Sequence, residues 1–88
     1  MQITDTRIRL LPEEGKVLAV ASVTFDDCFV VHNIKIISGE KGDFVAMPSR
    51  KDSEGRFKDI AHPLNQDTRE MVKEAVMIAY NKELNKEA

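Results

Sequence analysis

The chain has 88 residues, and its 13 lysines and arginines nearly balance its 15 aspartates and glutamates, which gives a formal net charge of −2. This balance excludes an overall positive field that would draw the protein to nucleic acid or to an anionic membrane, so any anion site has to be local. The single cysteine excludes an intrachain disulfide and is typical of a reducing compartment. No stretch reads as a signal peptide or a membrane span, so we expect a cytoplasmic protein with no membrane partner.

The length suits one domain spanning residues 1–88. A domain of this size buries only about 60–70% of the surface that its unfolded chain exposes, so its core is small. Small chains without disulfides often complete their core by pairing with a second copy. We therefore expect a homodimer.

The first half of the chain is typical of antiparallel strands. Residues 2–10 alternate, with Arg7 and Arg9 on the face opposite Ile8 and Leu10. Residues 11–15 predict a turn in which Gly15 is free to adopt positive φ. Residues 16–25 follow as a second strand, with its odd-numbered residues from 17 to 25 on one apolar face.

The third predicted strand, residues 29–37, is apolar on both faces. Strict alternation places these residues in two sets: Val30, Ile34 and Ile36 on one side, and Phe29, Val31 and Ile37 on the other. A sheet with one solvated face alternates more cleanly, so we expect something to cover each face. The chain offers one helix for this purpose, and a second subunit could supply the other cover.

Residues 39–42 predict a turn, residues 43–49 a fourth strand, and residues 57–61 a short fifth strand that ends at His62-Pro63 because proline has no amide donor.

From about residue 65 to residue 84 the apolar period changes to three or four, which indicates an amphipathic helix. Asn65 or Asp67 is its expected N-cap, and Asp67 with Glu70 resembles a capping box. Residues 85–88 are expected to fray. The predicted fold class is α+β: an antiparallel meander sheet of four to five strands within residues 2–62, followed by one C-terminal helix.

A local cluster of cations lies between residues 49 and 59. Arg50, Lys51, Arg56 and Lys58 surround a predicted turn at residues 52–55, which would display positive charge at its tip. Such cations neutralise phosphates and release counterions, so we expect nucleic-acid binding that weakens with salt. The alternative is a solvated loop whose cations pair with their acidic neighbours.

Other cations are secondary candidates. Arg7 and Arg9 share a strand face and could extend a positive surface, or they could simply discourage edge pairing. Arg69 and Lys73 lie one helical turn apart and could touch a phosphate backbone, although pairing with Asp67, Glu70 or Glu74 is the alternative.

The sequence does not favour a metal site or catalysis. Cys28 and His32 are four apart on the expected strand and share a face, but only His62 remains as a further histidine or thiol, too few for zinc. Asp26 and Asp27 are typical of a turn, and residues 39–42 lack the features of a phosphate-binding loop. We expect no cofactor, no metal, no small-molecule substrate and no enzymatic activity, because no acid, base and nucleophile converge by spacing.

Two runs carry a resemblance to a known family. Phe44-Val45-Ala46-Met47-Pro48-Ser49 followed by two cations, and Asp59-Ile60-Ala61-His62-Pro63, together with the Asp67-x-Arg69 helix start, resemble the stage V sporulation protein G (SpoVG) family over nearly the whole chain. The resemblance implies a bacterial cytoplasmic protein that binds DNA, and in some members RNA, and affects gene expression, sporulation and septum formation. It also implies a dimer built from a sheet and a C-terminal helix.

The leading hypothesis is therefore a non-enzymatic regulator that contacts DNA or RNA. Arg50 and Lys51 are its expected principal contacts, supported by Arg56, Lys58 and Arg69. The alternative is an adaptor in cell division or sporulation that binds a protein partner through an apolar surface, without nucleic-acid contact.

Overall fold

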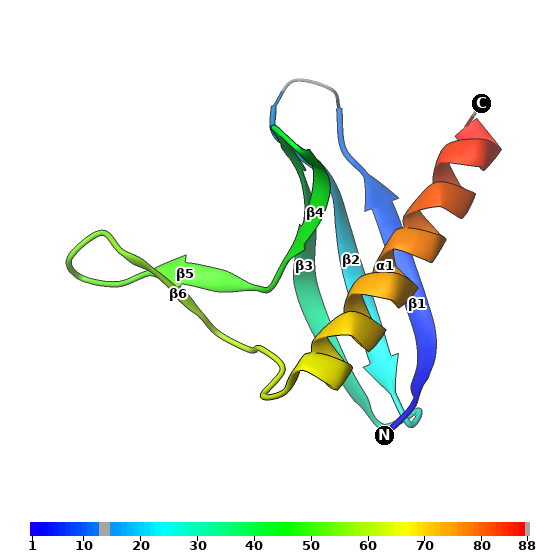
Figure 1. The fold of residues 1–88 in the computed structure, drawn as a ribbon, viewed down its shortest axis with the longest axis horizontal. Helices are drawn as coiled ribbons and strands as arrows, with labels where there is room; N and C mark the ends of the chain where they lie inside the picture. The colour runs from blue at the N-terminus through cyan, green and yellow to red at the C-terminus, as the bar shows by residue number, and fades with distance from the viewer. Residues whose placement is uncertain (13–14, 88) are drawn as a thin grey trace.

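The computed structural model describes residues 1–12 and 15–87 (Figure 1). Four antiparallel strands form one sheet in the order β1-β2-β3-β4, and two short strands form a separate hairpin. A single helix follows, so the predicted α+β class is confirmed. The elements are β1 (Ile3–Leu10), β2 (Val17–Phe25), β3 (Phe29–Gly39), β4 (Gly42–Ala46), β5 (Ser49–Lys51), β6 (Phe57–Asp59) and α1 (Gln66–Glu87).

The core lies between α1 and one face of the four-stranded sheet. The alternation predicted for the second strand is confirmed from Ala19 to Phe25, where the odd-numbered residues are all buried, whereas Val17 is half-buried and a register shift with β3 separates it from Ala19. Alanines at positions 19 and 21 leave room for the helix to approach the sheet, and burial of a large aliphatic side chain contributes about 1.5–3 kcal/mol. The buried hydrophobic residues that form this core are Ala19, Ala21, Val23, Phe25, Ile34, Ile36, Val72, Val76 and Tyr80.

A bulge in β3 changes which of its residues face the helix. Val31 pairs with Val23 and Ile34 with Ala21, so two residues of β3 lie opposite one residue of β2. Asn33 has a positive φ of 64° at this point, as expected of a residue that tolerates the left-handed region. The strict alternation predicted for residues 29–37 is therefore wrong, because the extra residue reverses which side chains face the helix before and after the bulge.

The consequence is that Phe29 and Val31 lie on the helix side together with Ile34, rather than on the opposite face. The face turned away from α1 carries exposed His32 and Lys35 beside half-buried residues of β2. A second cover on that face stays a prediction.

The predicted fourth strand over residues 43–49 divides into two. β4 ends at Ala46, and Pro48 is buried and cannot donate to a ladder, so the chain leaves the sheet there. Ser49 begins β5, and its partner β6 ends at Asp59, two residues before the predicted end of the fifth strand. The Ile60 amide donates to the Pro48 carbonyl at 2.7 Å and ties the two ends of this excursion together.

Asn65 is the N-cap of α1. Its Oδ1 accepts from the Thr68 amide at 2.8 Å, and its carbonyl accepts from the Arg69 amide at 3.2 Å. The capping box predicted for Asp67 and Glu70 is wrong, because the helix begins at residue 66 and Glu70 accepts instead from the Gln66 side chain at 2.8 Å.

The helix continues to Glu87, three residues beyond the predicted end at residue 84, and the expected fraying of the last residues stays a prediction. The predicted turn at residues 11–15 includes residues 13 and 14, which lie outside the described part of the chain, as does residue 88. Where the turn closes, the Leu11 amide donates to the Leu18 carbonyl at 3.0 Å. No helix in the described ranges is long and apolar enough to cross a membrane.

Candidate nucleic-acid interface

The cationic cluster forms a projecting hairpin, here called the finger, which comprises residues 49–59. The finger extends away from the sheet and the helix and touches the rest of the domain at its base (Figure 1). In its ladder Arg50 pairs with Lys58, and Lys51 pairs with Phe57. All four predicted cations of the cluster are thus brought together on one element.

Asp52 organises the turn at the fingertip. Its amide donates to the Arg56 carbonyl at 2.8 Å, and its carbonyl accepts from the Gly55 amide at 3.1 Å. Its Oδ1 accepts from the amides of Glu54 at 2.8 Å and Arg56 at 3.0 Å. Gly55 has a φ of 82°, a conformation that side chains rarely adopt, so the tip requires glycine there. The tip is a defined turn rather than an unstructured loop.

These hydrogen bonds set the charge state of Asp52. The amides of Arg56 and Glu54 stabilise its carboxylate and lower its pKa from the ordinary value of 3.8, and Lys58 adds to the same effect. The carboxylate is therefore charged throughout the neutral range. It is the acceptor around which the fingertip folds.

Two of the four finger cations have a carboxylate partner. Lys58 Nζ lies 3.6 Å from Asp52 Oδ2, and Arg56 Nε lies 3.8 Å from Glu54 Oε2. The cations of both pairs are largely exposed, and ion pairs of this kind contribute about 1 kcal/mol or less, so a polyanion could displace them.

Arg50 and Lys51 have no carboxylate within 4.0 Å among the residues that the structure describes. Both side chains are exposed, and Lys51 Nζ lies 5.4 Å from the centre of the Phe57 ring. A shallow hollow of about 440 Å³ lies beside them, lined by three cations of the finger as well as by Asp52 and Asp59. The two residues predicted as principal contacts are therefore the unpaired cations of the finger.

The like charges of Arg50 and Lys58 lie directly opposite each other in the ladder. Like charges at such a pair are destabilising, and a sequence selected for stability alone would place an acidic residue at one of the two positions. Local conflicts of this kind concentrate at functional sites. A bound anion would relieve the repulsion.

The secondary candidates are distributed over other surfaces. Arg7 and Arg9 lie on β1, at the opposite edge of the sheet from β4, and Arg7 Nε is held at 2.9 Å by Asp5. Arg69 lies in the first turn of α1, where its Nη2 is 3.5 Å from the Pro63 carbonyl, close to where the finger returns to the domain. The structure thus brings Arg69 near the finger base, and it places Arg7 and Arg9 elsewhere.

Lys73 is exposed on α1. Neither Arg69 nor Lys73 forms an ion pair with Asp67, Glu70 or Glu74 within the described ranges. The helix-surface pairing considered as the alternative for these two cations is therefore absent there.

The remaining sequence motifs have local structural roles. Cys28 belongs to the exposed turn between β2 and β3, so the prediction that it lies on the strand with His32 is wrong. His32 Nδ1 lies 2.9 Å from Ser22 Oγ. Asp26 and Asp27 have φ values of 51° and 54°, which confirms their role as turn residues. In the described ranges no three histidine, cysteine or acidic side chains gather where they could hold a metal ion.

Sequence reasoning did not identify the roles of Asp52 and Phe57. The Asp52-to-Gly55 spacing carries a signal for the first, because aspartate commonly accepts from the amide two residues on at a turn. The stacking of Lys51 on Phe57 depends on the ladder register, which local sequence does not specify. The role of Ile60 also depends on the fold, because its amide anchors the finger by donating to the carbonyl of Pro48.

The fold and the finger define a class: a small α+β domain with a four-stranded sheet, one helix and a cationic hairpin. The sequence model of the SpoVG family matches residues 1–82. Similar proteins cover most of this chain. They include one from Caldicellulosiruptor bescii, 64% identical over 80 residues (91% of each chain), and one from Thermoanaerobacter sp. strain X514, 59% identical over 88 residues (100% of this chain and 96% of the relative). A third, from Clostridium acetobutylicum, is 58% identical over 87 residues (99% and 92%). Each bears the name "Putative septation protein SpoVG". The chain belongs to the SpoVG family, and the resemblance found in the sequence is confirmed.

Proposed function

We propose that this protein is a non-enzymatic, cytoplasmic regulator that binds DNA or RNA through its finger. The observation that carries the proposal is that Arg50 and Lys51 are exposed on the projecting finger (Figure 1) and have no carboxylate partner among the described residues. Lys58 and Arg56 support them, and Arg69 lies at the finger base.

The mechanism is neutralisation of phosphates. A hairpin that stands clear of the domain can enter a groove or follow a backbone, and each phosphate that it neutralises releases condensed counterions. Arginine at position 50 can also form two parallel hydrogen bonds to a phosphate or a guanine edge, because its guanidinium is a planar fork. The binding energy is therefore local, in a protein whose net charge is −2.

The names of the relatives support a role of this protein in septation. We infer that the protein acts on septum formation and sporulation by regulating gene expression through nucleic-acid binding.

A homodimer belongs to the same proposal. An apolar groove of about 490 Å³ lies between the finger base, the start of α1 and the first half of β3. Three of its side chains, Phe29, Ile60 and Leu64, are 65%, 65% and 91% exposed, and such a contiguous apolar surface marks an interface. A second copy seated there would hold two fingers at a fixed separation. Size-exclusion chromatography with light scattering should report a dimer for the wild type and a monomer for Leu64→Ser with Ile60→Ser.

The test of nucleic-acid binding is a fluorescence anisotropy titration with labelled duplex DNA, single-stranded DNA and RNA at several salt concentrations. We expect Arg50→Ala with Lys51→Ala to weaken binding about tenfold or more and to reduce the slope of log K against log salt by about 2 on duplex DNA, since two phosphate contacts are lost. Lys16→Ala with Lys41→Ala removes two exposed cations far from the finger and is the matched control. Equal affinities of the two double variants would reject the assigned contacts.

The adaptor function is a second candidate, favoured by the same exposed apolar groove. The two functions separate in one comparison. A regulator that binds nucleic acid loses its cellular effect with Arg50→Ala and Lys51→Ala, whereas an adaptor retains it in that variant.

A further inference from the structure

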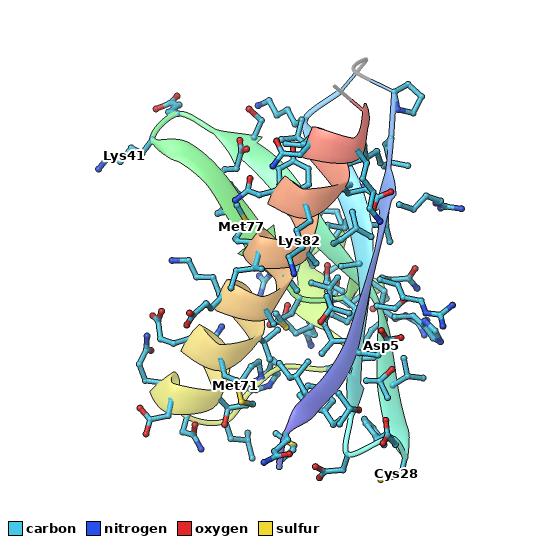
Figure 2. All side chains as sticks on the ribbon, turned by 90° about the vertical axis from the view of Figure 1, so that its right-hand side faces the viewer. Asp5, Cys28, Lys41, Met71, Met77 and Lys82 are labelled. Carbon is cyan, nitrogen blue, oxygen red and sulfur yellow. The ribbon has the colours of Figure 1, made fainter. Side chains whose placement is uncertain are left out.

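A second groove lies between the edge strand β1 and the helix α1, on the side of the domain away from the finger (Figure 1). Its volume is about 960 Å³, and it is lined by residues 1–6 of the chain and by α1 from Asp67 to Lys82. Figure 2 looks onto this side and shows α1 and β1 next to each other, with Met71 and Lys82 labelled on the helix. The proposed nucleic-acid contacts and the apolar groove at the finger base are both elsewhere.

One wall of this groove is a strand edge without a partner. β1 is the last strand of its sheet and, among the described residues, pairs only with β2, so half of its backbone donors and acceptors are directed outward. Its second half carries Arg7 and Arg9, and cations on an edge strand discourage pairing. The first half, from Ile3 to Thr6, carries no cation, and its ladder with β2 has a register shift between Ile3 and Asp5. Strand addition is therefore directed to residues 3–6, the part of β1 that lines the groove.

The other wall is an apolar strip of the helix. Met71, Ala75, Ile78 and Ala79 line the groove, and Ile78 is 49% exposed although it lies within the helix. The two alanines are small, so they leave room for side chains of an added strand. A groove between an edge strand and a helix is the geometry by which some domains bind extended peptides, with backbone hydrogen bonds on one side and side-chain pockets on the other.

The charges of the lining decide what kind of chain fits. Three carboxylates of α1 line the groove, those of Asp67, Glu70 and Glu74, together with the cations Lys82 and the amino-terminal group of Met1. The carboxylate of Asp5 lies 2.9 Å from Arg7 Nε on the side of β1 away from α1 (Figure 2), and Asp67 and Glu74 have no ion pair among the described residues. A second copy docked here would bring two such linings together, with six carboxylates against four cations, which is unfavourable. A cationic chain is the complementary occupant.

We propose that this groove binds an extended basic segment of a partner protein, which adds as a strand to β1 at residues 3–6. Apolar side chains of the segment pack on Met71, Ala75 and Ile78, and its lysines or arginines reach the carboxylates of the first three turns of α1. This binding is independent of the finger, so the protein has two interaction surfaces on opposite sides of one domain.

The probe is a synthetic library of labelled seven-residue peptides in which Val, Ile or Leu alternates with Lys or Arg. A matched library carries Glu in place of the basic residues. We expect members of the basic library to bind the full chain, to shift the amide resonances of residues 3–6 in NMR spectra, and to bind at least about tenfold more tightly than their acidic counterparts. Methylation of alternate peptide nitrogens should abolish binding, because it removes the donors that strand addition requires.

Two charge variants localise the contact. Glu70→Lys with Glu74→Lys should weaken peptide binding about tenfold, whereas Glu40→Lys with Asp43→Lys, an equal change at the β3–β4 turn, should leave it unchanged. Arg50→Ala with Lys51→Ala should also retain peptide binding, so failure here and failure of nucleic-acid binding are distinguishable. The proposal is overturned if no basic peptide binds, if both charge variants weaken binding equally, or if the β1 amides shift on concentrating the protein alone, which would make a second copy the occupant.

Discussion

Lys51 and Phe57 face each other across the finger, with the lysine Nζ 5.4 Å from the centre of the phenyl ring. The ladder places the two residues directly opposite, so the ring holds the ammonium group on one face of the hairpin. Arg50, the other unpaired cation, is opposite Lys58 and projects from the other face, since neighbouring strand residues alternate. The finger therefore presents cations on both faces.

We expect Phe57→Leu to keep the hairpin but to release Lys51. A cation–π contact at an exposed site contributes about 0.5–1 kcal/mol, so the loss of stability should be of that size. The measurement is the NMR resonance of the Lys51 ε-methylene protons, which the ring shifts upfield in the wild type and which should move downfield in the variant. Lys58 serves as the control, and unchanged Lys51 resonances would contradict the contact.

Asp52 should make the finger sensitive to acid. Because its pKa in the folded protein is lowered from 3.8, its carboxylate stabilises the fold at higher pH, and this contribution is lost as the pH falls from 3.8 through the lower folded value. Asp52→Asn should therefore flatten the dependence of unfolding free energy on pH in that acidic window. Urea unfolding curves at a series of pH values measure the slope. A slope equal to that of the wild type would show that Asp52 does not organise the tip.

Asn33 should tolerate glycine and reject branched residues. Its φ of 64° lies in the left-handed region, where a side chain with a Cβ costs about 1–2 kcal/mol unless it is asparagine or aspartate. Asn33→Val should lose about that amount of stability in urea unfolding, and Asn33→Gly should be close to neutral. Lys35→Val, an exposed change on the same strand, is the control for the hydrophobic substitution. Equal stability of Asn33→Val and Lys35→Val would argue against the bulge.

The N-cap Asn65 should contribute more to the stability of the protein than Asp67, the acidic residue in the first turn of the helix. Asn65→Ala removes the acceptor for the Thr68 amide and should cost about 1 kcal/mol, whereas Asp67→Ala loses only a favourable interaction with the helix dipole, worth less at an exposed position. Asn81→Ala, in the middle of the helix, should be neutral or stabilising because alanine favours helix. Thermal unfolding compares the three variants. A larger loss in Asp67→Ala than in Asn65→Ala would contradict the observed helix start.

Much of the fold could be predicted from local patterns. The alternation in β1 and β2 and the change of period after Pro63 depend only on side chains a few residues apart, so these elements were found within a few residues of their bounds. The third strand was assigned to the right segment but to the wrong faces, because the bulge at Asn33 is favoured only when β3 pairs with β2. The sequence predicts either Asn65 or Asp67 as the N-cap of the helix. Which of the two caps it depends on where the chain turns after the finger.

The residues of the candidate site could be predicted from the sequence, but their arrangement in a hairpin could not. Four cations within nine residues were visible at once, whereas their division into paired and unpaired cations required the ladder of β5 and β6. The buried Pro48, whose carbonyl accepts from the Ile60 amide, makes the last residues of the predicted fourth strand the base of a separate hairpin. No local signal reports a hydrogen bond between residues twelve apart.

The amino-acid sequence by itself determined the class of fold, the family and the location of the cationic cluster, because periodicity, turn residues and short motifs act over a few neighbouring positions. Only the tertiary structure decided that the cluster stands clear of the domain, that Arg50 and Lys51 lack carboxylate partners among the described residues, and that an acidic groove opens between β1 and α1. These features arise from contacts between segments that are distant along the chain, and their geometry is fixed only when the sheet and the helix have packed.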